Sequence, residues 1–351
     1  MGTVQRQGDD RMTGTARRGA LVGYGVIGEG HADGYERQTD LEIVAVVDVC
    51  AERRDAGVGR FPLANGYSSI QQAIDGERLD FIYICTPPSF HSEQISLGLN
   101  HDLFVICEKP LLLSSAETSD VMTLLQRTGG RLQPAHNYGY APAIRRLLGV
   151  VHDEIGDLEG ARFSTQRTGH ARGTDSWSPD WRRDQTFSGG GILQDHGPHS
   201  VYLASRAARS RPTAVSCHLK RPDQGPHRHT EDEAHLVLEF GSVLVEIELS
   251  WRAGRRATRY ELTGTAGTVA LDGDHLELAR PGGTVSELIP SDFDDPKHGR
   301  WFAVLLADAS SAMASAETSN DLLDEAIVTV VVLEAAYRSA ADGGRRIVLE
   351  R

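Results

Sequence analysis

From Gly19 to about residue 137, short apolar runs alternate with segments of helical length. The runs are rich in β-branched and aromatic residues and read as almost continuous apolar stretches, as expected of parallel strands buried on both faces. The predicted strands are 20–22, 43–47, 81–85 and 104–107, and the predicted helices are 26–37, 69–75, 90–99 and 114–127. This alternation predicts a parallel sheet with helices on its faces, the α/β arrangement of a Rossmann domain.

Beyond residue 137 the pattern changes, because apolar runs follow one another without long helices between them. Within the run 243–251, four apolar residues alternate with Leu244, Glu246 and Glu248, which is typical of a strand with one buried face. The runs are 158–167, 212–221, 234–240 and 243–251. They predict an α+β domain with a large, mainly antiparallel open sheet, closed by a long helix over 319–341 that Ser319 would cap.

These patterns divide the chain into three parts. A length of 351 residues accommodates two domains at roughly 100 to 200 residues each. We expect a dinucleotide-binding domain over 19–137 and a substrate-binding and oligomerisation domain over 138–351. Residues 1–18 show no periodicity and are expected to form a disordered leader.

Composition limits the partners of this chain. Its 36 Lys and Arg against 49 Asp and Glu give a net charge of −13, which repels nucleic acid and anionic membranes at long range. No apolar run is long enough to span a bilayer, and the N-terminus lacks the apolar core of a signal peptide. We therefore expect a cytoplasmic protein whose four scattered cysteines stay reduced.

A glycine motif after the first predicted strand indicates a dinucleotide site. It reads Gly23-Tyr24-Gly25-Val26-Ile27-Gly28 and opens the first predicted helix. In this context the three glycines allow a tight turn, close approach of a pyrophosphate, and packing of helix on sheet. The alternative is a chance match, since the chain has 37 glycines.

Asp48 supports the dinucleotide interpretation. It ends the second predicted strand, 20 residues after Gly28, where a carboxylate can accept a hydrogen bond from a ribose 2′-hydroxyl. That preference favours NAD, although Arg53 and Arg54 are near enough to leave NADP open. The alternative for Asp48 is a turn residue at a strand end.

Two further sites emerge from position alone. Thr86 and Glu108 follow predicted strands at the sheet edge where open α/β folds bind ligands, so Lys109 is expected to point into the same crevice. A solvated surface lysine is the alternative. Asp195 and His199 are four residues apart and would share one face of a helix, where a carboxylate can orient a histidine.

Several short motifs together resemble the Gfo/Idh/MocA oxidoreductases, a family that includes glucose-fructose oxidoreductase and inositol dehydrogenase. The resemblance covers roughly residues 19–349. Besides the glycine motif, it depends on Cys85-Thr86-Pro87-Pro88 with His91, Glu108-Lys109-Pro110, Trp181-Arg182, Gly189-Gly190-Gly191, Asp195-His196-Gly197-Pro198-His199, and Glu334-Ala335-Ala336-Tyr337-Arg338-Ser339.

The resemblance implies roles for individual residues. It makes Lys109, Asp195 and His199 the catalytic set, in which His199 exchanges the hydroxyl proton, Asp195 orients the substrate or the histidine, and Lys109 assists. It also implies additional cofactor contacts from Thr86, Pro87, His91, Glu108, Lys109, Asn137, Trp181 and Arg182.

The chain departs from many relatives at two positions. Gly139 stands where they carry an arginine, and Tyr202 stands where they carry an acidic residue or asparagine. Candidate substrate residues are therefore Tyr138, Tyr140, Arg182, His196 and Tyr202, with packed aromatics as the alternative for the tyrosines. By its place between Asp195 and Gly197, His196 is expected to face away from His199.

Four histidines in the second domain do not predict a metal site. His227 and His229 would point to opposite sides of an extended loop, and Arg228 between them opposes a cation. Zinc sites usually have tighter ligand spacing. We therefore expect no metal at the set His218, His227, His229 and His235.

The resemblance implies an NAD(P)-dependent enzyme that acts on a secondary alcohol or ketone of a sugar, cyclitol or nucleotide sugar. Two alternatives remain: a non-catalytic NAD-binding sensor, and a redox-neutral NAD-dependent glycosidase. Retention of Lys109, Asp195 and His199 favours the dehydrogenase or reductase. Relatives commonly pair through the C-terminal sheet, so a homodimer or homotetramer is expected.

Overall fold

The computed structural model describes residues 16–291, 293, 299–315 and 321–349. Its first sheet is parallel, with the strand order β3-β2-β1-β4-β5-β6. The strands are β1 (Arg17–Val22), β2 (Leu41–Val47), β3 (Asn65–Tyr67), β4 (Phe81–Ile84), β5 (Phe104–Glu108) and β6 (Leu132–Ala135). The predicted α/β domain is confirmed.

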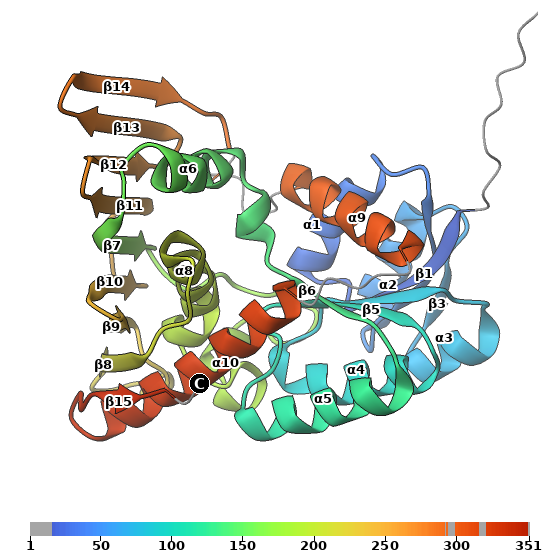
Figure 1. Cartoon of the computed structure of the whole chain (residues 1–351). Coiled ribbons are helices and arrows are strands. Elements are labelled where there is room, and N and C mark those ends of the chain that lie inside the picture. Colours follow the sequence, from blue (N-terminus) through green and yellow to red (C-terminus); the bar gives the residue numbers. More distant parts are fainter. Residues whose placement is uncertain (1–15, 292, 294–298, 316–320, 350–351) are drawn as a thin grey trace, which may run out of the picture.

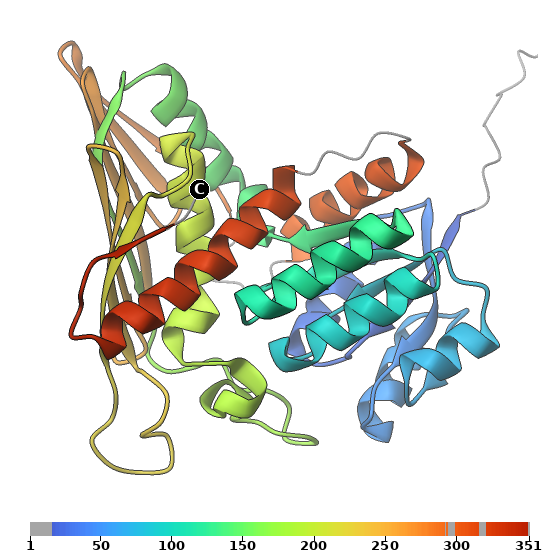
Figure 2. The same ribbon diagram turned by 60° about the horizontal axis from the view of Figure 1, so that its bottom comes forward.

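Helices cover both faces of this sheet (Figures 1 and 2). They are α1 (Val26–Tyr35), α2 (Ala51–Arg60), α3 (Ile70–Gly76), α4 (His91–Asn100) and α5 (Ser115–Thr128). Ser114 accepts a hydrogen bond from the Glu117 N–H and caps the start of α5, and Gly129 ends the helix at φ 65°.

The second sheet has nine strands in the order β14-β13-β12-β11-β7-β10-β9-β8-β15. All neighbours are antiparallel except β7 and β10, so the expected, mainly antiparallel sheet is confirmed. Its strands are β7 (Leu158–Gln166), β8 (Ala214–Lys220), β9 (Glu233–Phe240), β10 (Val243–Ser250), β11 (Ala257–Gly264), β12 (Gly267–Asp272), β13 (His275–Arg280), β14 (Gly283–Leu288) and β15 (Ile347–Val348).

In the described part of the chain, helices pack on one face of the second sheet, the face toward the first domain (Figure 1). They are α6 (Pro142–Asp153), α8 (Ile192–Ala208) and α10 (Asp321–Ala341). In β10, Val245, Ile247 and Leu249 are buried against these helices, whereas Leu244 is half exposed on the open face. The short elements η1 (Pro88–Phe90), η2 (Asn137–Tyr140), η3 (Trp181–Arg183) and α7 (Gln185–Ser188) lie in the connections.

The C-terminal segment serves both domains. Helix α9 (Gly299–Ala314) packs on α1, where the rings of Phe302 and His31 are in contact at a centroid distance of 3.6 Å and tilted by 41°. The first half of α10 buries Leu323 in the core of the first sheet, and its second half buries Leu333 under the second sheet. The division at residue 137 stays a prediction, but the expectation that everything after it belongs to one domain is corrected by these contacts.

The structure also corrects the predicted ends of elements. β1 begins at Arg17, whose N–H donates to the Asp40 carbonyl, so the expected leader overlaps the first strand by two residues. Residues 1–15 and the predicted cap Ser319 lie outside the described residues. No helix in the described parts of the chain is long and apolar enough to cross a membrane.

Candidate active site

A groove runs along the carboxyl ends of β1 and β4, where the strand order of the first sheet reverses. This is the place where open α/β sheets bind ligands. Gly23 turns the chain with φ +87°, and a Cβ on Gly28 would lie 2.4 Å from the Gly23 carbonyl oxygen. A Cβ on Gly25 would meet nothing within 4 Å. The backbone thus leaves a cradle at the N-terminus of α1, where free N–H groups can bind a pyrophosphate.

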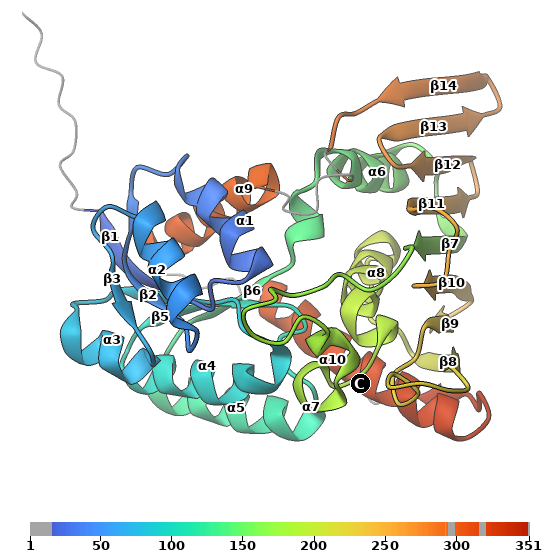
Figure 3. The same cartoon turned by 180° about the vertical axis from the view of Figure 1, so that it is seen from behind.

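The groove has a volume of about 620 Å³ and receives residues from both domains. Among the predicted cofactor residues, those that line it are Gly23, Gly25, Val26, Ile27, Asp48, Thr86, Pro87, Trp181 and Arg182. Figure 3 shows the chain between β7 and α8 reaching from the second sheet to the first domain. Gly173, Thr174 and Trp177 of this connection line the groove, although no sequence pattern indicated them.

Six predicted cofactor residues do not line the groove, and three of them, Tyr24, Gly28 and His91, line neither the groove nor the cavity beside it. Tyr24 is buried, with its ring close to Gly57, and Gly28 packs under the Gly23 carbonyl. His91 is fully buried, with Nε2 2.9 Å from the Thr86 carbonyl oxygen and Nδ1 3.0 Å from that of Pro110. The expected direct contacts of these three residues with the cofactor are thereby corrected. His91 instead supports the site, because it joins the two loops that carry Thr86 and Lys109.

Asp48 lies in the groove but already has several donors. Its oxygens accept from the Tyr24 and Cys50 N–H groups and from Arg53, whose Nη2 is 2.7 Å from Oδ1 and whose Nε is 3.1 Å from Oδ2. Arg53 also donates to Thr174 Oγ1 at 2.7 Å. The ribose-binding position thus combines an acceptor for a 2′-hydroxyl with a guanidinium that can bind a 2′-phosphate.

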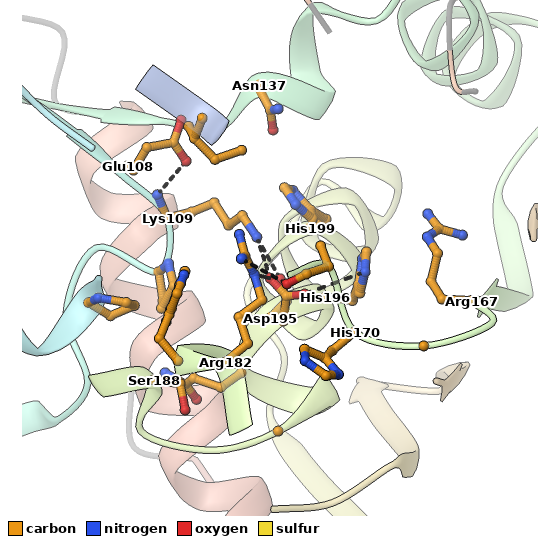
Figure 4. Close-up of a pocket in the computed structure, with 18 of the residues that line it drawn as sticks. Glu108, Lys109, Asn137, Arg167, His170, Arg182, Ser188, Asp195, His196 and His199 are labelled. Atoms are coloured by element: carbon orange, nitrogen blue, oxygen red, sulfur yellow. Dashed lines mark hydrogen bonds and ion pairs between the residues drawn. The ribbon is translucent and has the colours of Figure 1, made fainter. Parts of the chain in front are cut away.

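A second cavity of about 330 Å³ lies beside the groove. Both spaces are lined by Ile27, Cys85, Thr86, Trp181 and Arg182, so they adjoin each other. Glu108, Lys109 and Asn137, three predicted cofactor residues, line the second cavity together with Tyr138, Asp195, His196 and His199. Figure 4 shows side chains of β5, α8 and the β7–α8 connection converging on this space.

Lys109 connects the two domains within this cavity. It follows β5, and its Nζ donates to the Asp195 carbonyl oxygen at 2.7 Å and to Oδ1 at 3.2 Å (Figure 4). Burial alone would raise the pKa of the Asp195 carboxyl, but the charges of Lys109, His196 and Arg182 outweigh it and hold that pKa well below its usual value. Asp195 is therefore ionised and fixes the lysine ammonium within the cavity.

His199 is buried on the same helix, α8, one turn after Asp195. Its ring stacks on Tyr138 at 3.9 Å between centroids, and its Nδ1 has no partner among the described residues. Burial, followed by the charges of Lys109 and His196, lowers the pKa of His199 well below 6.5. The imidazole is neutral and can accept a proton.

The structure corrects two expectations about this helix. Asp195 does not bond to His199: its Oδ2 lies 3.7 Å from His196 Nε2. His196 does not face away from His199 either, because the two rings are 6.2 Å apart and both line the cavity. Burial lowers the pKa of His196 to about 3, so this imidazole is also neutral.

Tyr140 and Tyr202 do not reach the cavity, which corrects their place among the candidate substrate residues. Tyr202 is buried and stacks on His136 at 4.4 Å with an interplanar angle of 10°. Tyr140 is buried below the guanidinium of Arg145. A Cβ on Gly139 would lie 2.4 Å from the Tyr202 hydroxyl, so the two departures from the family pattern, Gly139 and Tyr202, pack against each other.

Two buried carboxylates support the site, and sequence patterns indicated this role for neither. Glu231 accepts from the N–H groups of Gly191 and Leu193 at the start of α8 and from the Tyr337 hydroxyl. Glu108 accepts from His31 Nε2 at 2.8 Å. Glu231 thereby anchors the helix that carries Asp195 and His199.

Within the described residues, the histidines of the second domain form no cluster that could hold a metal ion. His227 instead lies 6.0 Å from His170, a cavity residue, as measured between ring centroids. The absence of a metal stays a prediction.

Comparisons with known proteins identify the family. The oxidoreductase family with an NAD-binding Rossmann fold (Gfo/Idh/MocA) matches residues 17–136, and the Gfo/Idh/MocA C-terminal domain matches residues 148–270. The chain belongs to the Gfo/Idh/MocA oxidoreductase family. Its first domain is thus an NAD-binding Rossmann domain, as the glycine cradle indicates.

The names of several relatives describe enzymes that act on a sugar or a cyclitol. A D-apiose dehydrogenase of Paraburkholderia graminis is 27% identical over 275 residues, which cover 76% of this chain and 71% of the relative. A scyllo-inositol 2-dehydrogenase (NADP(+)) of Bacillus subtilis is 23% identical over 92% of this chain and 96% of its own length. The structure of GenD2 from gentamicin A biosynthesis, in complex with NAD, superimposes with a TM-score of 0.83 at 23% identity and covers both chains fully.

The Asp48–Arg53 pair predicts how this Gfo/Idh/MocA protein chooses its cofactor. Replacing Arg53 by alanine removes the cation and leaves the Asp48 carboxylate to repel a 2′-phosphate. We expect NADP binding to weaken at least tenfold, which is about the contribution of one charged hydrogen bond. NAD binding should change less than threefold. Calorimetric titration with both cofactors measures this. Arg60→Ala is the matched control, because Arg60 lies on the same helix and pairs with Asp33 and Glu36 outside the groove. Equal losses for both cofactors would contradict the assignment.

The lowered pKa of His199 predicts a mostly neutral imidazole at pH 6.5. A group whose pKa lies below 6.5 is less than half protonated at that pH and gains its proton only on further acidification. Proton–nitrogen NMR of the histidine rings, with His199→Gln to assign the signal, measures this directly. We expect the native His199 nitrogens to titrate at a lower pH than in denaturant, where their midpoint lies at about 6.5. A native midpoint at or above 6.5 would overturn the interpretation.

Proposed function

We propose that this protein is an NAD-dependent dehydrogenase or reductase that transfers a hydride between the nicotinamide and a secondary alcohol or ketone of a sugar, cyclitol or nucleotide sugar. The observation that carries the proposal is that the cavity lined by Lys109, Asp195 and His199 adjoins the cofactor groove and shares five lining residues with it. NAD, when bound, supplies a nicotinamide C4 that accepts or returns the hydride.

Three side chains would handle the substrate hydroxyl. In the oxidative direction the hydrogen of the C–H bond leaves as a hydride with both bonding electrons. The hydroxyl proton moves to the neutral imidazole of His199, and a carbonyl forms. Lys109 stabilises the developing alkoxide by donating a hydrogen bond, and Asp195 keeps its ammonium in place. A positioned base of this kind contributes roughly 100- to 10,000-fold to the rate.

The names of the relatives support the substrate class. D-Apiose and scyllo-inositol both carry secondary hydroxyls, and both named enzymes are dehydrogenases. The cavity of about 330 Å³ has the size of a monosaccharide-type site, at the lower end of the volumes known for ligand pockets.

Two expectations about the surroundings of the protein accompany this proposal. A homo-oligomer would form through the open face of the second sheet. Leu244 of β10 is half exposed, and Arg162 of β7 forms an ion pair with Glu246 of β10. We also keep the prediction that the protein works in the cytoplasm.

The direct test follows absorbance of NADH while the protein and NAD meet a panel of inositols, hexoses and nucleotide sugars. We expect turnover of at least one compound, reduced at least 100-fold in Lys109→Ala and in His199→Ala, with NAD binding nearly unchanged by calorimetry. Lys220→Ala is the matched control, since Lys220 is 80% exposed on β8 and lines neither the groove nor the cavity. Full turnover in both active-site variants, or silence of the whole panel despite bound NAD, would refute the proposal.

A further inference from the structure

Arg167 is a buried cation in the wall of the catalytic cavity, and the predicted mechanism does not use it. It follows β7 directly and is only 4% exposed. Nη1 donates to the Gln166 and Ala257 carbonyl oxygens at 2.8 and 2.9 Å and to Thr258 Oγ1 at 3.1 Å. Nη2 lies 3.4 Å from the Tyr138 hydroxyl. These acceptors are neutral, so one nitrogen is held firmly while the guanidinium has no carboxylate partner among the described residues.

The cavity as a whole carries excess positive charge. Its cationic lining residues are Lys109, Arg167, Arg182 and Arg256. Its only carboxylates, within the part of the chain that the structure describes, are Glu108 and Asp195. Glu108 is bonded to His31, and Asp195 is bonded to Lys109 and lies 3.5 Å from Arg182. Cationic residues thus outnumber carboxylates in the cavity lining, although the chain as a whole has a net charge of −13.

A guanidinium buried without a counter-charge is costly, because burial removes most of its hydration. Carboxylates offset this cost best, since their two oxygens match the two parallel N–H bonds of one guanidinium edge. In Arg167, Nε has no hydrogen-bond partner in the described structure, and Nη2 has only the long contact to Tyr138. The edge formed by Nε and Nη2 is thus the less satisfied one.

The position of Arg167 also sets the distance between an anion and the reacting hydroxyl. Tyr138 stacks its ring on His199 and directs its hydroxyl to Arg167. In Figure 4, Arg167 lies on the far side of His196 from Lys109. An anion at Arg167 would consequently be separated from a hydroxyl at His199 by several bonds.

We propose that the natural substrate carries a carboxylate, which Arg167 binds with Arg256 nearby, and that the oxidised hydroxyl lies several carbons away, as in a sugar acid or a carboxylated cyclitol. The inference rests on the proposed dehydrogenase function and narrows its substrate class. Short 2-hydroxy acids fit poorly, because their hydroxyl and carboxylate are on adjacent carbons.

The experiment compares matched pairs of acid and neutral sugar, D-glucuronate with D-glucose and D-galacturonate with D-galactose, by NADH formation. We expect kcat/KM for at least one acid to exceed that of its neutral partner at least tenfold, as one charged hydrogen bond provides. In Arg167→Met the preference for the acid falls at least tenfold, chiefly through KM. Arg60→Met is the control, since Arg60 pairs with Asp33 and Glu36 and lines neither the groove nor the cavity, and it keeps the preference.

A second variant covers a failure of Arg167→Met to fold. Arg167→Lys keeps the charge but loses the planar pair of donors, so the preference for the acid should fall by a smaller factor. Quenching of bound NADH fluorescence by the acid reports binding independently of turnover and should weaken in the same order. If neutral sugars reduce NAD as well as their acids do, or if Arg167→Lys keeps the full preference, this inference fails alone. If no compound reduces NAD although NAD binds, the dehydrogenase proposal fails with it.

Discussion

The contact between Lys109 and Asp195 is the interaction on which the site depends. Lys109 extends from the end of β5 in the Rossmann domain, and Asp195 lies in the first turn of α8 in the second domain. The ammonium donates to both the carbonyl and the carboxylate of one residue, so position and charge are fixed together. Lys109 and Asp195 both line the cavity that holds His199, so this contact joins the two domains inside the site.

The rest of the fold keeps these two residues in register. Glu231 fixes the start of α8, and the pair of His31 and Glu108 fixes the end of β5. Phe302 of α9 packs its ring against His31, so a helix from the C-terminal segment supports the strand that Lys109 follows. Helix α10 lies across both cores (Figure 2). The chain thus returns to its first domain to stabilise the boundary at which the chemistry is proposed.

The sequence predicted those features that arise from local pattern. The glycine motif, the strand ends at Thr86 and Glu108, and the spacing of Asp195 and His199 each depend on a few neighbouring residues. Contacts between distant segments could not be predicted in this way. Arg53 and Thr174 are 121 positions apart, and Arg167 enters the cavity only because β7 lies in the centre of the second sheet. Tyr202 was predicted to contact the substrate, but its ring stacks on His136. These two residues are far apart in the sequence, so no local pattern indicates this contact.

The most direct test of this account is a crystal structure of the protein with NAD bound. The account predicts that the pyrophosphate lies on the cradle at Gly25 and that the nicotinamide ring enters the cavity between Lys109 and His199. C4 should then face the open space beside Lys109 Nζ, where a substrate carbon can approach to about 3.5 Å. A nicotinamide ring that lies outside the cavity, or a Lys109 that leaves Asp195 to bind a phosphate, would contradict it.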